Sequence, residues 1–197
     1  MKKILYISIF LSVLLAGTNS AVAQDKFSEV RYGAQFGYEW ISNAYNHNGY
    51  SMNLNFDYKF HRTFYGSCII HAGSCQWHTD KEIIVSGNSE NKKFRHNVNE
   101  IIIGIGPGAD LISNKEDRVF VCLYAGASSL MKKNDIFNDD KGEIEVRETH
   151  NAGFGSLVHL GYEHCFHNIA TLGGSLEGIY SCGQFNWGIN IRFGFSF

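Results

Sequence analysis

The chain ends in a run in which apolar and polar residues alternate. From Trp187 to Phe197, every second residue is aromatic or Ile, and the residues between them are Gly, Asn, Arg or Ser. Because successive side chains of a β-strand point to opposite faces, this run predicts a strand with one apolar and one polar face. The pattern is typical of a transmembrane β-barrel, with lipid outside and a polar lumen. The alternative is an edge strand of a soluble β-sandwich.

Two more strands of this kind are predicted near the start of the chain, at Glu29 to Trp40 and at about Tyr50 to His61. In the first strand, Arg31 shares a face with Gly and other polar residues, and the opposite face is aromatic. An Arg on the lipid face near the membrane midplane costs roughly 2–4 kcal/mol, so we expect the Arg31 face to point into the lumen. A slip of one residue would place all of these polar groups in lipid.

Five further strands complete a predicted antiparallel, up-and-down barrel of eight strands. The facing of the third, fifth and seventh strands is ambiguous, because both of their faces carry apolar or small residues. In the fourth strand, Pro107 lacks a ladder donor and predicts a bulge. These five strands are expected at about 64–77, 98–112, 118–130, 152–166 and 169–180.

The predicted connections alternate in length. Short turns are expected around residue 62 and at 113–117 and 167–168, and a small connection at 181–186. Outer-membrane barrels have short periplasmic turns and longer outer loops, so the short turns and both chain termini are expected on the periplasmic side. The long connections are expected at 41–49, 78–97 and 131–151.

The first 23 residues have the features of a secretory signal peptide. Lys2 and Lys3 precede the apolar run Ile4 to Leu15, and the small residues Ala21-Val22-Ala23 form a cleavage site. The apolar run is shorter than the roughly 20 residues that a transmembrane helix needs, although an uncleaved anchor remains the alternative. Residues 24–197 are then a single barrel domain, since no linker-like stretch interrupts them.

Composition narrows the classes of partner. The net charge of the chain is −2, and the mature chain is more negative because the signal peptide carries Lys2 and Lys3. This charge argues against nucleic acid as a partner. No apolar run of 18 residues follows the signal peptide, which excludes a helical membrane protein.

Charged residues of both signs fall on the predicted inward faces. An eight-stranded barrel has a lumen that side chains can fill, so we expect these groups to pair into a structural network that plugs it. A narrow or gated ion path is the alternative, because buried charges in membrane proteins often mark pathways. The predicted lumen charges are Arg31, Glu39, Asp57, Lys59, Asp110, Glu163 and Arg192.

Catalytic, cofactor and metal sites are not predicted. A membrane-embedded enzyme would need a His, a Ser and an acidic partner held together, and His71, His159 and His164 are interpreted as lumen or interfacial residues instead. The five cysteines have no CxxC spacing, so we interpret them as packing residues, and neither a zinc site nor a disulfide framework is supported.

The two longest connections, 78–97 and 131–151, contain short strand-like segments, Glu82 to Val85 and Glu143 to Glu148. They could form hairpins that project beyond the membrane, with exposed edges able to pair with partner strands. We favour the simpler interpretation of solvated loops, which could still contact an extracellular ligand. The Asp residues at 135, 139 and 140 do not have EF-hand spacing.

The first strand, Tyr32 to Tyr38, and the last strand, Gly188 to Phe195, resemble those of the outer membrane protein β-barrel domain family. These are the small porin-family barrels, which are OmpA-like and OmpX-like. The terminal aromatic residues Phe193, Phe195 and Phe197 resemble the sorting signal that the barrel-insertion machinery recognises. The resemblance implies the cell outer membrane, a lipid-facing exterior and a structural or surface-interaction role. A small porin or ion channel and a lipid A-modifying enzyme are the alternatives.

Overall fold

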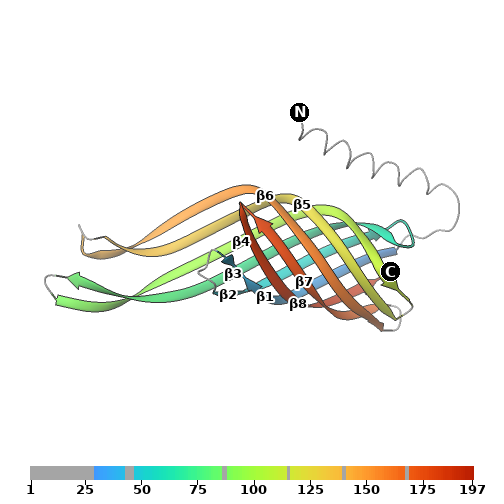
Figure 1. The fold of residues 1–197 in the computed structure, drawn as a ribbon, viewed down its shortest axis with the longest axis horizontal. Helices are drawn as coiled ribbons and strands as arrows, with labels where there is room; N and C mark the ends of the chain where they lie inside the picture. Colours follow the sequence, from blue (N-terminus) through green and yellow to red (C-terminus); the bar gives the residue numbers. More distant parts are fainter. Residues whose placement is uncertain (1–28, 43–46, 86–87, 115, 139–140, 167–168) are drawn as a thin grey trace, which may run out of the picture.

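A computed structural model describes residues 29–42, 47–85, 88–114, 116–138, 141–166 and 169–197. The predicted signal peptide lies outside the described residues. Eight strands form a closed barrel, which Figure 1 shows from the side. They are β1 (Glu29–Trp40), β2 (Asn48–Lys59), β3 (Phe64–Val85), β4 (Asn88–Ser113), β5 (Asp117–Asn138), β6 (Glu143–Phe166), β7 (Ala170–Ser181) and β8 (Gln184–Ser196).

The strands follow one another around the ring. Each strand pairs antiparallel with its sequence neighbour, and β1 also pairs with β8, from Arg31 opposite Ser196 to Trp40 opposite Trp187. The prediction of an eight-stranded, antiparallel, up-and-down barrel is therefore confirmed. Because the ring is closed, the strands have no free edge within the barrel wall.

The polarity of the barrel is inverted relative to a soluble protein. Arg31 is 8% exposed, whereas its neighbour Tyr32 is 51% exposed. The same alternation runs along all of β2, and along β8 as far as Gly194, with polar or small residues buried and large apolar residues exposed. The facing predicted for these strands is confirmed. Within the described residues, no helix has the length and hydropathy needed to cross a membrane.

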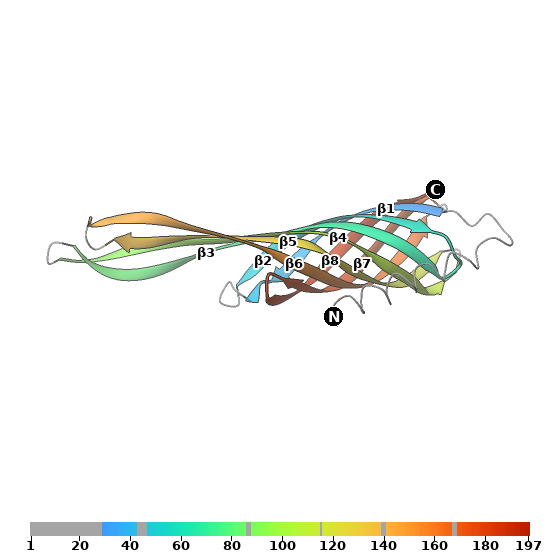
Figure 2. The same ribbon diagram turned by 90° about the horizontal axis from the view of Figure 1, so that it is seen from above.

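Two long hairpins project from one end of the barrel (Figures 1 and 2). The β3–β4 ladder continues to Val85 opposite Asn88, and the β5–β6 ladder continues to Asn138 opposite Glu143. The favoured interpretation of 78–97 and 131–151 as loops is therefore wrong, because both segments are mostly strand. The alternation of apolar and polar residues is weak in each segment, but side-chain pairs across the two strands stabilise the whole hairpin.

The connections after β2, β4, β6 and β7 have two to four residues, whereas the one after β1, residues 41–47, has seven and lies partly outside the described residues. The β7–β8 turn consists of Cys182 and Gly183, both with positive φ (48° and 88°), as a two-residue type I′ hairpin requires. The predicted bulge at Pro107 is wrong: the β4–β5 register is unchanged across Pro107 and shifts between Asp110 and Ile112. We call the barrel end with the β2–β3, β4–β5 and β6–β7 turns the turn end, and the opposite end the hairpin end. The C-terminus lies at the turn end (Figure 1).

Candidate functional site

Charged side chains meet inside the lumen near the turn end. Asp110 of β4 is approached by three cations: Lys59 Nζ lies 2.7 Å from its Oδ2, Arg118 Nε 2.5 Å from its Oδ1, and Arg31 Nη1 3.4 Å from both oxygens. Its side chain is only 1% exposed. Charges buried inside a membrane-spanning barrel are costly, so each must be surrounded by charges of the opposite sign.

The same cluster extends across the lumen through two arginines. Arg118 Nη1 donates to Glu163 Oε2 at 2.9 Å, and Arg192 Nε donates to Glu163 Oε1. Asp57 Oδ2 lies 3.5 Å from Arg192 Nη2 and 3.8 Å from Arg118 Nη2. We call this group the turn-end cluster; it contains Arg31, Asp57, Lys59, Asp110, Arg118, Glu163 and Arg192.

A second polar group lies inside the lumen near the hairpin end. His71 of β3 is fully buried, and its Nε2 lies 3.1 Å from Glu100 Oε1 and 3.5 Å from Glu39 Oε2. Glu177 of β7 lies on the other side of the ring, with its Oε2 3.9 Å from His71 Nδ1. We call Glu39, His71, Glu100 and Glu177 the hairpin-end cluster.

The structure therefore brings six of the seven predicted lumen charges together and places the seventh, Glu39, in a different cluster. Sequence reasoning missed Arg118, Glu100 and Glu177, and it treated His71 only as a filler. Glu100 could have been found, because it shares its parity with the inward-facing Gly104 and Asp110. Arg118 and Glu177 lie on β5 and β7, whose facing the sequence left ambiguous.

An apolar cluster fills the β3–β7 side of the lumen between the two charged groups, whereas the buried amides of Gln35 and Asn55 line the β1–β2 side. Tyr65 and Phe120 are almost fully buried in the lumen, with Arg118 and Arg192 carbons 4.4 and 4.8 Å from the centre of the Phe120 ring. The lumen is thus less polar than expected, because β3 to β7 contribute apolar side chains to it. This mid-lumen cluster contains Tyr65, Ile69, Ile102, Phe120, Cys122, Tyr124, Leu157 and Ile179.

A second apolar layer lies at the hairpin end. Trp77 is 6% exposed and packs with residues from neighbouring strands in what we call the rim cluster: Ile41, Cys75, Trp77, Val98 and Leu130. All eight strands contribute buried side chains to the lumen, which an eight-stranded barrel can just accommodate. The arrangement favours a plug over a broad pore. All five cysteines are free.

The projecting hairpins leave strand edges without a neighbour. β6 pairs with β5 from Glu143 onward but with β7 only from Gly155 onward, and Phe154 O accepts from Cys182 N–H, so residues 143–153 have one unpaired edge. β3 pairs with β2 only as far as Ser74, which leaves residues 75–85 with one as well. Beyond the pair His96 and Asn134, the β4–β5 ladder ends, although Asp135 Oδ2 still accepts from Arg95 N–H of the other hairpin. The predicted Asp139 and Asp140 lie outside the described residues.

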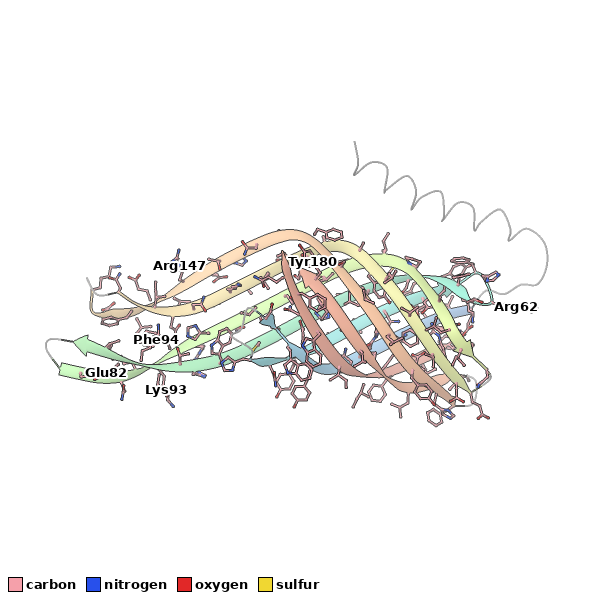
Figure 3. All side chains as sticks on the ribbon, in the orientation of Figure 1. Arg62, Glu82, Lys93, Phe94, Arg147 and Tyr180 are labelled. Carbon is pink, nitrogen blue, oxygen red and sulfur yellow. The ribbon has the colours of Figure 1, made fainter. Side chains whose placement is uncertain are left out.

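Both faces of the β5–β6 hairpin tip reach solvent. Val146 is 65% exposed, Ile136 40% and Ile144 38%. Charged side chains of both signs are interspersed with them, and Figure 3 shows Arg147 on this hairpin and Glu82, Lys93 and Phe94 on the other. The tip therefore combines an unpaired backbone edge with exposed β-branched residues.

The C-terminal aromatic residues lie on the exterior. Phe193, Phe195 and Phe197 are 49, 54 and 73% exposed. Phe197 also exchanges two backbone hydrogen bonds with Val30, at 2.9 and 3.0 Å, which extends the β1–β8 closure to the last residue. A protein factor could therefore reach these side chains from outside the barrel.

Comparisons with known proteins agree on the fold. Neisserial surface protein A is 11% identical, with a TM-score of 0.52 over 86% of this chain and 97% of that one. A major outer membrane protein from Thermus thermophilus is 9% identical, with a TM-score of 0.52 over 86% and 99%. The attachment invasion locus protein Ail of Yersinia pestis, in complex with the heparin analogue sucrose octasulfate, is 14% identical, with a TM-score of 0.50 over 86% and 97%.

No protein-family model matches the chain, and no curated protein matches it in sequence. The structural likeness therefore establishes that the chain has the fold of outer-membrane barrels.

Proposed function

We propose that this protein spans the bacterial outer membrane and acts at the cell surface as a binding protein, without a broad pore and without enzymatic activity. The inverted polarity supports the membrane location, because water is a poor solvent for an aromatic exterior and lipid is a good one. The signal peptide expected at residues 1–23 supports export, and the aromatic C-terminus supports recognition by the insertion machinery. The turn end and both termini then face the periplasm.

The observation that supports the binding role is the free edge of β6 at residues 143–153. An unpaired edge offers a row of backbone donors and acceptors, and an extended polypeptide can add to it as a further strand. Exposed Ile144 and Val146 would contact alternate side chains of that partner. We therefore propose an extended polypeptide segment as the ligand.

Binding of a polyanion, as in the Ail complex, is a second candidate that the charges do not favour. Three lysines of the two hairpins are paired with acidic residues: Lys92 with Glu90 at 3.6 Å, Lys133 with Glu148 at 3.1 Å and Lys141 with Glu145 at 2.7 Å. A polyanion site would need an excess of positive charge.

The orientation can be tested with an epitope inserted beside Gly142, at the tip of the β5–β6 hairpin. Antibody should bind intact cells that carry this insertion. The matched control places the same epitope beside Arg62, in the β2–β3 turn at the other end of the barrel (Figure 3), where antibody should bind only after permeabilisation. The reverse result, or a protein found in the soluble periplasmic fraction, would contradict the proposed location.

The ligand class can be tested with a phage-displayed library of random peptides, panned against the purified protein in detergent. We expect enrichment of peptides with alternating apolar residues. Replacing residues 132–149 by Asn-Gly joins the paired residues Met131 and His150 through a two-residue turn and removes most of the edge, residues 143–149. Enrichment should be lost with this variant, whose folding is checked by heat-modifiable electrophoretic mobility. Equal enrichment with both proteins would refute the strand-addition role and leave the location intact.

The absence of a broad pore can be tested by bilayer conductance of the refolded protein. Large, stable conductance steps would contradict the plug and favour the small-porin alternative. Lipid A analysis of an expressing strain would likewise expose a lipid-modifying activity.

A further inference from the structure

Three metal-binding side chains converge in the lumen beneath the rim cluster. Glu39, His71 and Glu100 come from β1, β3 and β4, and one donor atom of each lies within 4.8 Å of the other two. Tetrahedral coordination with bonds of about 2.1 Å places ligand atoms about 3.4 Å apart. His71 Nε2 lies 3.1 and 3.5 Å from the two carboxylates, so two of the three donor pairs stand close to that spacing, and the two carboxylates lie within 4.8 Å of each other.

Outer-shell contacts orient two of the three donors. The Asn53 side chain donates its Nδ2 to Glu177 Oε1 at 2.5 Å, which leaves its Oδ1 to accept from His71 Nδ1 at 2.6 Å. A neutral His71 protonated on Nδ1 then directs the Nε2 lone pair toward the carboxylates. Asn186 Nδ2 donates to Glu100 Oε2 at 2.9 Å. Histidine ligands in metal sites are commonly held in this way through their second nitrogen.

The third donor, Glu39, has no such support. Its side chain is fully buried, and apart from His71 Nε2 at 3.5 Å from Oε2, its carboxylate oxygens have no hydrogen-bond partner among the described residues. A buried carboxylate left without hydrogen bonds is expensive. Its position is nevertheless built into the fold, because a Cβ at Gly73 would lie 2.3 Å from Glu39 Oε2 and 3.0 Å from Glu100 Cγ. Any side chain at position 73 would therefore have to displace the Glu39 carboxylate from its present position.

We propose that Glu39, His71 and Glu100 bind a divalent transition-metal ion, with Zn²⁺ the best match to one imidazole and two carboxylates. A divalent cation balances the two carboxylate charges around a neutral imidazole and satisfies the orphaned oxygens of Glu39. Because the three ligands come together only when β1, β3 and β4 have paired around the ring, the ion stabilises the closed barrel. Among the described residues, no other group of three His, Cys, Asp or Glu side chains brings its donor atoms this close.

The competing occupant is a proton. An imidazolium at His71 would pair with both carboxylates without any metal, and it would leave the geometry almost unchanged. Ca²⁺ and Mg²⁺ fit less well, because they prefer six or more oxygen ligands or an octahedral shell that retains water. The test must therefore separate a bound transition metal from a buried ion pair.

The experiment is to refold the protein in detergent with Zn²⁺, remove free metal by desalting and measure retained zinc by elemental mass spectrometry. We expect a stoichiometric amount of zinc, a higher unfolding temperature than after refolding with EDTA, and no retention of Ca²⁺. Refolding with Co²⁺ should give the visible absorption of a low-symmetry site. No retained zinc and no Co²⁺ spectrum in the wild-type protein would overturn the proposal in favour of the ion pair.

Variants locate the ion. Glu39→Gln and His71→Gln should each lower zinc affinity by more than the roughly 10- to 100-fold that loss of an outer-shell partner costs, and Asn53→Ala should lower it by about that amount. Gly73→Ala keeps every ligand but displaces the Glu39 carboxylate, so it should also lose zinc. His159→Gln replaces a buried histidine outside the set and should retain it. Folding of each variant is checked by electrophoretic mobility. If Glu39→Gln and His71→Gln both retain as much zinc as the wild-type protein, the assignment is also overturned.

Discussion

The ring of Phe120 on β5 occupies the space that a side chain at Gly161 on β6 would need. The two residues are directly opposite in the β5–β6 ladder, and a Cβ at Gly161 would lie 2.3 Å from Phe120 Cζ. The guanidinium groups of Arg118 on β5 and Arg192 on β8 lie against the same ring. Phe120 therefore has little freedom to move away.

Gly161→Ala is expected to destabilise the barrel by about 1–3 kcal/mol, because the added methyl group overpacks the mid-lumen cluster. The measurement is urea unfolding in lipid vesicles. Gly153→Ala is the matched control on the same strand, since its Cβ would meet nothing closer than 3.8 Å. The smaller side chain in Phe120→Leu should recover part of the loss in the double variant. Equal effects of the two glycine substitutions would contradict the steric explanation.

The mid-lumen cluster also explains which strands could be predicted from the sequence. On β1, β2 and β8, the inward face is polar and the outward face is apolar, so alternation alone gives the facing. On β3, β5 and β7, inward residues such as Ile69, Phe120 and Ile179 are apolar, and alternation disappears. The facing of these strands is decided by their register with the neighbouring strands, which cannot be read from the sequence of one strand alone.

The candidate site could be predicted only in part for a related reason. Alternation tells which face a residue occupies but not its level along the barrel axis. Arg31 and Glu39 lie on the same face of β1, yet roughly 25 Å of strand separates them. Arg31 therefore joins the turn-end cluster and Glu39 the hairpin-end cluster. The hairpins were only the less favoured interpretation of their sequence, because their apolar residues are sparse and their pairing partners lie across the turn.

Asp110 is expected to be the residue of the turn-end cluster least tolerant of neutralisation. Asp110→Asn removes the negative charge shared by Arg31, Lys59 and Arg118 and leaves three cations close together in a buried site. We expect a loss of about 3–5 kcal/mol in unfolding free energy, the range for breaking a buried ion pair on one side.

Asp117→Asn is the matched control at the same end of the barrel. Asp117 accepts hydrogen bonds from Tyr162 and His164 but has a side chain that is 39% exposed. An exposed pair contributes only about 0–1 kcal/mol. If the two variants lose comparable amounts of unfolding free energy in urea, the ion pairs of Asp110 do not stabilise the barrel more than an exposed pair does.

The lipid contact can be tested by placing a charge on the exterior. Ile103 on β4 is 60% exposed in the middle of the barrel wall, and Ile136 on the β5–β6 hairpin is 40% exposed beyond it. Ile103→Arg should cost about 2–4 kcal/mol in a bilayer if this face contacts hydrocarbon. Ile136→Arg should change stability by less than about 0.5 kcal/mol, as at an ordinary water-exposed position. A tolerated Arg at both positions, measured by unfolding in vesicles, would refute the membrane assignment.

The pairing of the two strands in the β5–β6 hairpin can be tested through the pKa of Glu148. Lys133, directly opposite on β5, places its Nζ 3.1 Å from Glu148 Oε2, and His150 Nε2 lies 2.7 Å from Oε1. The hydrogen bond from Lys133, and then that from His150, lower the pKa of Glu148 below its ordinary value of 4.5. A depressed carboxylate pKa means that the pairing stabilises the hairpin above pH 4.5 and that this contribution disappears as the pH falls through the lowered pKa.

Lys133→Met should move the pKa of Glu148 back toward 4.5, measured by NMR of the side-chain carboxyl carbon. Lys141→Met, which removes a different carboxylate's partner at the tip of the same hairpin, should leave the Glu148 titration unchanged. An unchanged titration in Lys133→Met would show that the β5–β6 ladder does not extend this far from the barrel.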